Sequence, residues 1–229
     1  MTERPFLMEM PRRARIIFPE VGVHVVQRGN NRNPCFFRES DYLLYLRLLG
    51  KFARRCNCSI HTYCLMTNHV HLFLTPRDAD SCAQLMKNVT QHFSQYINRT
   101  QGRTGTLWEG RFRSCPVADE RYSLACYRYI ELNPIRAGIA ARLDEYPWSS
   151  YGANAGLRRD SLIEPHPAYL ALADEPRRRA QRYADLAASG IDAKIVDDIR
   201  HATRNSMLLS NQRAKRGRPK KMGSVPIFG

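Results

Sequence analysis

The sequence predicts an α+β protein with a ferredoxin-like core, an antiparallel sheet with helices on one face, followed by a C-terminal helical and basic extension. Segments with strand alternation and segments with helical spacing follow one another in the order β-α-β-β-α-β, and one further helix comes next. The 229 residues, 43% of them hydrophobic, suffice for one buried core plus an appendage. From residue 146 the composition changes, so the core pattern ends there.

The core elements follow from their periodicities. Residues 21–28 alternate as a strand, which a turn-rich loop at 29–34 ends. Asp41 is expected to be the N-cap of a helix that runs to Arg55, because apolar residues recur in it at helical spacing. The remaining core elements are predicted as strands at 59–64, 69–74 and 112–117 and helices at 81–99 and 119–132, the last closed by Pro134.

The C-terminal part differs from the core in composition. Residues 146–167 are rich in Pro, Gly, Ser and Asn and are expected to form a connector. Two short helices are predicted at 175–188 and 191–203. No acidic residue follows Asp198, so the last stretch is a basic tail without the composition of a packed core.

Charge indicates a polyanionic partner. The chain has 36 Lys and Arg against 21 Asp and Glu, a net charge of +15 that is expected of a protein binding many phosphates. Its seven cysteines form no C-x-x-C pair, which favours neither a disulfide framework nor a structural zinc site. No apolar run reaches the roughly 20 residues that span a bilayer, and no signal-peptide pattern opens the chain. We therefore expect a cytoplasmic, nucleoid-associated protein.

Two histidines share one face of a predicted strand. Because strand side chains alternate, His69 and His71 point to the same side, whereas Val70 and Leu72 point to the other. Two imidazoles at this spacing suit a divalent metal ion, either Mg²⁺ or the more imidazole-tolerant Mn²⁺. The alternative is a pair of polar strand residues with no metal.

The helix at 119–132 offers a phenol and, just beyond it, an amide. Tyr129 and Asn133 are four residues apart and lie one above the other. At about 100° per residue Tyr127 faces away from Asn133, and Tyr122 lies roughly three turns away. Tyr129 is therefore the candidate nucleophile, unless it is an ordinary boundary aromatic. Glu131 faces elsewhere and is expected to have a structural role.

This set of groups suits phosphodiester transfer. A cation held by neutral imidazole and amide ligands keeps nearly its full charge for polarising a phosphodiester. A tyrosine that attacks the phosphorus retains the bond energy in a phosphotyrosine ester, so no nucleotide cofactor is needed. No Walker-type glycine loop is visible in the sequence, which agrees with this interpretation.

Basic, amide and aromatic side chains are candidates for nucleic-acid contact. The loop that begins at Arg28 combines guanidinium forks with amides, or it is a hydrogen-bonded turn with solvated arginines. Trp108 suits either base stacking beside its arginines or packing. The basic tail around Arg216 is either an AT-hook-like minor-groove binder or a solvated segment. The DNA-binding candidates are Arg28, Asn30, Asn31, Arg32, Trp108, Arg111, Arg113, Arg216 and Arg218.

Four motifs, in order, carry a resemblance to a known family. They are Val25–Arg32, Tyr63–His71, Gly105–Phe112 and Tyr127–Gly138. Together they resemble the REP-associated tyrosine transposases of the HUH superfamily (His, hydrophobic residue, His), relatives of the single-tyrosine insertion-sequence transposases. The resemblance covers about residues 15–152.

The resemblance implies a metal-dependent single-stranded DNA nickase and strand transferase that acts near REP-type hairpins. It implies His69, His71 and Asn133 as metal ligands and Tyr129 as nucleophile. Residues 1–153 would form the catalytic domain, and residues 154–229 the connector, short helices and tail. A monomer is favoured, and a dimer that exchanges tyrosine helices stays open.

Two other functions remain as alternatives. The first is a regulator that binds DNA hairpins without cutting them. The second is an RNA-binding or RNA-processing protein on the same sheet architecture, although no RRM signature is present in the sequence.

Overall fold

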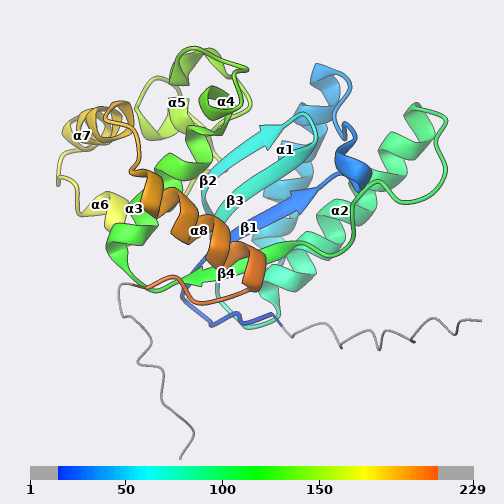
Figure 1. The fold of residues 1–229 in the computed structure, drawn as a ribbon, viewed down its shortest axis with the longest axis horizontal. Helices are drawn as coiled ribbons and strands as arrows, with labels where there is room; N and C mark the ends of the chain where they lie inside the picture. Colours follow the sequence, from blue (N-terminus) through cyan, green and yellow to red (C-terminus); the bar gives the residue numbers. More distant parts are fainter. Residues whose placement is uncertain (1–14, 211–229) are drawn as a thin grey trace, which may run out of the picture.

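The sheet has four antiparallel strands in the order β2-β3-β1-β4 in a computed structural model that describes residues 15–210 (Figure 1). This architecture confirms the predicted ferredoxin-like class, and each strand boundary lies within two residues of its predicted position. The strands are β1 (Gly22–Arg28), β2 (Cys58–Met66), β3 (His69–Pro76) and β4 (Arg113–Val117).

Helices α1 (Glu39–Arg55) and α2 (Ser81–Thr100) cover one face of the sheet (Figure 1). Their apolar residues pack with the sheet residues of that face, among them Val25 and Leu72, into one continuous core. The exposed residues of each helix are polar, as the spacing of the apolar residues predicts, except for Leu43 of α1. This core fixes β3 so that His69 and His71 face away from α1 and α2.

The predicted N-cap of the first helix is wrong. Helix α1 begins at Glu39, so Asp41 lies inside its first turn. The Asp41 carboxylate accepts hydrogen bonds from the backbone N–H groups of Phe37 (2.8 Å) and Arg38 (3.0 Å). An acidic residue at the third helical position thus satisfies donors that precede the helix, as in a capping box.

The opposite face of the sheet is covered as well. Helices α3 (Glu120–Glu131) and α8 (Ala193–Asn205) lie across it (Figure 1) and share a second core with Phe73 and Cys115 of the sheet. The predicted one-sided arrangement therefore holds for α1 and α2 only. Helix periodicity shows that a helix has an apolar side but does not show which surface covers it.

Helix α3 is well defined at its start, and a second short helix follows its expected end. The Asp119 carboxylate accepts from the backbone N–H of Arg121 at 2.8 Å, which caps the helix. Helix α4 (Asn133–Arg136) follows after Leu132, which keeps helical dihedral angles. Pro134 stands in the first turn of α4, where its missing N–H costs nothing, and so does not close the chain's helical course.

Segments after α4 protect both edges of the sheet. Along β2, the backbone N–H of Leu65 donates to Trp148 O at 2.9 Å. Along β4, the N–H of Leu209 donates to Pro116 O at 2.8 Å. Unpaired strand edges are therefore covered by the chain itself. The other helices of this region are α5 (Tyr151–Asn154), α6 (Pro167–Leu170) and α7 (Pro176–Ala188).

None of the helices within residues 15–210 is both long enough and apolar enough to traverse a bilayer.

Candidate active site and nucleic-acid interface

The two histidines lie side by side on the face of the sheet that α3 and α8 cover. Their ring centroids are 5.0 Å apart, and the two rings are nearly perpendicular. In the neighbouring strand β1, Arg28 is paired with His69 and Val26 with His71. The H-x-H spacing therefore places both imidazoles on one face, next to a basic strand end.

Tyr129 of α3 packs against this pair. Its ring is 7% exposed and lies edge-on to His71, with the centroids 5.7 Å apart. The guanidinium of Arg136 lies 4.4 Å from the centre of the phenol ring, and its Nη2 donates to the Tyr129 carbonyl at 2.6 Å. A cation over the ring face holds the phenol side chain in place.

The other two tyrosines of α3 are engaged elsewhere. The Tyr127 side chain is fully buried, and its hydroxyl accepts from the backbone N–H of His166 at 3.2 Å. The Tyr122 hydroxyl donates to Asp198 of α8 at 3.3 Å. Among these three phenols, only that of Tyr129 packs against the imidazoles, which supports the choice made from helical spacing.

Asn133 stands at the start of α4, one turn after Tyr129. Its amide nitrogen donates to the carbonyls of Tyr129 (3.1 Å) and Ile130 (3.2 Å). The amide orientation is therefore set by the end of α3, and the side-chain oxygen is left for another partner. The contacts that join His69 and His71 to Tyr129 are between aromatic rings, and the Asn133 amide takes no part in them.

Both histidines of the pair have their Nδ1 atoms occupied. Asn68 uses its amide nitrogen to donate to Arg32 O at 2.9 Å, so its side-chain oxygen accepts from Nδ1 of His69 at 2.6 Å. Nδ1 of His71 lies 3.0 Å from Nε2 of His24 in β1. Metal-binding histidines commonly make such a hydrogen bond with the nitrogen that does not bind the metal.

Burial keeps these imidazoles neutral. Desolvation and, to a smaller extent, the nearby Arg28 together lower the pKa of His69 to about 4. Desolvation and the neighbouring histidines hold the pKa of His71 well below its ordinary value. A neutral imidazole is the form that binds metal ions, so both rings are ready for a cation at neutral pH.

The residues present fit a cation only if an amide oxygen takes part. Among residues 15–210, no group of three His, Cys, Asp or Glu side chains could hold a metal ion. Two Nε2 atoms from His69 and His71 together with the side-chain oxygen of Asn133 would form a neutral donor set. Such a set leaves coordination positions for phosphate oxygens and water.

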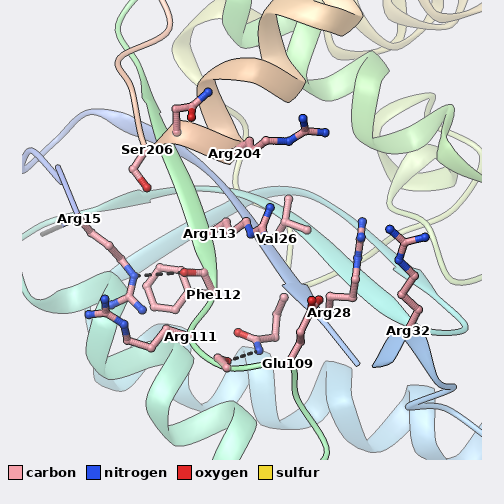
Figure 2. Close-up of a pocket in the computed structure, with 13 residues that line it drawn as sticks. Arg15, Val26, Arg28, Arg32, Glu109, Arg111, Phe112, Arg113, Arg204 and Ser206 are labelled. Atoms are coloured by element: carbon pink, nitrogen blue, oxygen red, sulfur yellow. Dashed lines mark hydrogen bonds between the residues drawn. The ribbon is translucent and has the colours of Figure 1, made fainter. Parts of the chain in front are cut away.

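A strongly basic pocket of about 880 Å³ opens beside the histidines. Figure 2 shows Arg15, Arg28 and Arg204 reaching it from three different segments of the chain. One glutamate offsets six arginines in its lining, so the local potential is positive. The arginines that line it are Arg15, Arg28, Arg32, Arg111, Arg113 and Arg204.

The predicted nucleic-acid contacts do not all lie at one site. Arg28, Arg32, Arg111 and Arg113 line the basic pocket. Trp108 is 8% exposed and belongs to the core beneath α2, where its indole N–H donates to Thr90 O at 3.4 Å. Its position favours packing over base stacking.

Asn30 and Asn31 lie in a short 3-10 turn beside Arg32. Both Asn31 (φ 51°) and Arg32 (φ 58°) have left-handed backbone angles, and of the three residues only Arg32 lines the pocket. Arg216 and Arg218, the AT-hook candidates, lie outside the described residues.

Glu131 is the centre of a buried polar cluster just after Tyr129. Its side chain is 1% exposed, and burial raises its pKa against the opposing effect of its hydrogen bonds. Four neutral groups donate to it, so its structural role is supported. The donors are Thr62 Oγ1 (2.9 Å), Ser150 Oγ (2.6 Å), Asn154 Nδ2 (2.8 Å) and the Tyr183 hydroxyl.

Sequence reasoning missed several residues around the site. His24 is not among the predicted site residues, yet it contacts both His71 and Tyr129 (5.5 Å between the ring centroids of His24 and Tyr129). Strand alternation contained one signal, because His24 and Arg28 are four residues apart and share a face. Neither Arg136, which lies in the fourth motif, nor Arg204 was singled out as a site residue; the structure places Arg136 over the Tyr129 ring and Arg204 in the lining of the pocket.

Comparisons with known proteins show the family of the chain. The family model described as IS200-like transposase matches residues 18–133, half of the chain, so the chain belongs to the IS200-like transposase family. A protein of Haemophilus influenzae assigned as a REP-associated tyrosine transposase is 24% identical over 114 residues. That match covers 45% of this chain and 61% of the relative, less than two thirds of the relative's length.

A solved structure is also similar. It is the structure of a REP-associated tyrosine transposase bound to a REP hairpin, with a TM-score of 0.55 and 16% identity. The similarity covers 69% of this chain and 99% of that chain, and at such identity it establishes the fold. Together these matches confirm the resemblance to REP-associated tyrosine transposases.

Proposed function

We propose that this transposase-family protein is a metal-dependent single-stranded DNA endonuclease and strand transferase. It cuts near REP-type hairpins and forms a 5′-phosphotyrosine intermediate at Tyr129. One observation carries the proposal: the Tyr129 phenol lies against His71, the second member of an imidazole pair whose Nδ1 atoms are both occupied.

The covalent step exchanges one phosphate ester for another. The Tyr129 oxygen attacks the phosphorus, its proton is released, and the bond from phosphorus to the 3′ oxygen breaks. That oxygen takes up a proton and leaves as a 3′-hydroxyl, while the 5′-phosphate stays on the tyrosine. Arg136, whose guanidinium lies 4.4 Å from the ring centre, stabilises the developing phenolate.

The residues of the site fit a divalent cation, Mg²⁺ or Mn²⁺. His69, His71 and Asn133 would hold it through two imidazole nitrogens and one amide oxygen. When bound, the cation supplies Lewis-acid polarisation of the phosphodiester. The protein's own contribution is to orient both imidazoles and to place the phenol beside them.

The basic pocket is the proposed path of the single strand. Its lining includes Val26 and Arg28, which pair in the sheet with His71 and His69. A DNA strand bound in the pocket would therefore reach the proposed reaction centre. Residues 1–153 supply the ligands and the nucleophile in this proposal. The extension contributes Arg204, which lines the pocket, and helix α8, which lies with α3 on the second face of the sheet.

Removing one pocket arginine is expected to weaken hairpin binding through lost phosphate contacts. For Arg28→Ala and for Arg113→Ala, the plot of log K against log salt should flatten by about 0.7–0.9 per arginine. Fluorescence anisotropy with a labelled hairpin at several salt concentrations measures this slope. Arg47→Ala, an exposed change on α1 at the other face, is the control. An unchanged slope in both pocket variants would remove the pocket from the DNA path.

The tyrosine is proposed to act on its own chain, in a monomer. Tyr129 packs on the histidines of the same chain, and Glu131 is bound by donors of the same chain. A mixture of His71→Ala with Tyr129→Phe should therefore form less than about a tenth of the wild-type adduct, since neither chain has both groups. Recovery to about a quarter of the wild-type yield in the mixture, from one competent site in each mixed dimer, would show exchange of tyrosine helices between two chains. Light scattering on a sizing column checks the oligomeric state independently.

The test of the function uses labelled hairpins from palindromes that flank the gene, incubated with Mn²⁺, Mg²⁺ or EDTA and separated on a denaturing gel. A metal-dependent band of protein carrying DNA is the expected result. Tight hairpin binding without an adduct under any metal would support the regulator instead. Preference for a ribo hairpin over the deoxy hairpin would support the RNA-binding function.

A further inference from the structure

A buried chain of hydrogen bonds connects the C-terminal helix α8 to His71. Thr203 Oγ1 lies 2.9 Å from Nδ1 of His24, a residue 179 positions earlier in the sequence. Nε2 of His24 then lies 3.0 Å from Nδ1 of His71. All three side chains are at most 6% exposed, so the protein alone decides where the protons of this chain lie.

The two imidazoles meet in the plane of their rings. They are within 5° of parallel, and their centroids are 5.3 Å apart. A face-to-face stack would bring the centroids closer, whereas the 3.0 Å between nitrogens plus two ring radii accounts for the observed spacing. The contact is therefore a well-aligned hydrogen bond between the ring edges.

The Thr203 hydroxyl sets the direction of this chain. Its single proton is directed to the Ile199 carbonyl, one turn back along α8, at 2.8 Å. The oxygen then has two acceptor positions, which face Nδ1 of His24 and the thiol of Cys115 at 3.2 Å. With its donor and both acceptors used, the hydroxyl accepts from His24 and cannot donate to it.

The remaining assignments follow from one proton per neutral imidazole. His24 has its proton on Nδ1, so its Nε2 must accept. The donor to that Nε2 is Nδ1–H of His71, which leaves Nε2 of His71 unprotonated. If Thr203 donated instead, both rings would switch, and Nε2 of His71 would carry a proton that blocks a metal ion.

We propose that Thr203, acting through His24, is a positioning residue that holds His71 in the tautomer whose Nε2 is free to bind a divalent cation. The proposal rests on the proposed function, because it concerns the same metal site. Because Thr203 lies in α8, the C-terminal extension would take part in preparing the metal site. Asn68 acts on His69 by the equivalent hydrogen bond, so two separate devices prepare the two rings alike.

The tautomers can be measured in metal-free protein. Long-range ¹H–¹⁵N spectra of histidine-labelled protein in EDTA distinguish Nδ1–H from Nε2–H, with the signals of His71 assigned by loss in His71→Gln. Wild type is expected to show Nδ1–H for His24 and His71. In Thr203→Val the acceptor is gone, so we expect both rings to shift toward Nε2–H. Thr203→Ser keeps the hydroxyl and should retain the wild-type pattern.

Mn²⁺ binding, followed by electron paramagnetic resonance, is the second readout. Thr203→Val is expected to weaken Mn²⁺ binding about 10–100-fold, the usual cost of losing such a partner, with hairpin affinity in EDTA unchanged. His24→Phe keeps an aromatic ring, removes the acceptor and should weaken binding to the same extent, which covers a failure of Thr203→Val to fold. An unshifted His71 tautomer with Mn²⁺ affinity within about twofold of wild type would overturn the proposal. If wild-type protein formed no covalent adduct with the hairpin, the proposed function would be refuted instead. The two failures are distinguishable because the tautomers are measured without metal or DNA.

Discussion

Tyr129→Phe is expected to abolish the covalent protein–DNA adduct and to lower hairpin cleavage by about 10³-fold or more, as removal of a nucleophile commonly does. The change deletes one hydroxyl from a ring that keeps its contacts with His71 and Arg136. The fold and the basic pocket should therefore be unaffected. The measurement is the adduct band on a denaturing gel with labelled hairpin and Mn²⁺.

The matched control is Tyr122→Phe on the same helix. The Tyr122 hydroxyl bonds to Asp198 of α8 and does not contact the histidines, so adduct formation should stay within about twofold of wild type. Hairpin affinity in EDTA should be equal for wild type and both variants. An adduct of normal yield in Tyr129→Phe would show that another residue is the nucleophile.

Glu131→Ala is expected to lower the free energy of unfolding by about 3–5 kcal/mol, because four buried donors lose their acceptor and a cavity remains. These donors come from β2, from Ser150, from α5 and from α7, and they bind the carboxylate two residues after Tyr129. The melting temperature should fall by about 10 °C or more. Urea denaturation of the metal-free protein measures the loss directly.

Two variants calibrate this result. Glu131→Gln keeps one acceptor oxygen and should cost clearly less than Glu131→Ala. Glu120→Ala, an exposed change in the first turn of α3, should cost only about 0.5 kcal/mol through the helix dipole. A Glu131→Ala protein as stable as Glu120→Ala would mean that the cluster does not anchor the tyrosine helix.

Local periodicity was enough to predict much of the core. Alternation placed His69 and His71 on one face of β3, and helical spacing singled out Tyr129 from Tyr127 and Tyr122. The order of strands and helices predicted the antiparallel sheet. The errors are local too: Asp41 acts from inside α1 rather than at its cap, and Pro134 starts α4 rather than ending the helical run.

Other features depend on where residues far apart in the sequence meet. Trp108 had equal reasons to bind a base or to pack, and its place beneath α2 favours packing. Glu131 was known only to face away from Tyr129, and its four donors come from segments that no spacing rule connects. Arg204 reaches the basic pocket because α8 crosses the second face of the sheet.

The sequence by itself determined the element order, the pairing of imidazoles on one strand face, the choice of tyrosine and the basic character of the surface. The element order, the histidine pairing and the choice of tyrosine depend on periodicity and side-chain direction within a few residues, which backbone geometry fixes locally. The basic character follows from composition alone. Only the tertiary structure decided what covers the second face and which residues, His24 and Thr203, lie in a hydrogen-bonded chain with His71. Those contacts join positions as far as 179 residues apart, and they form only because burial of apolar surface brings α8 onto the sheet.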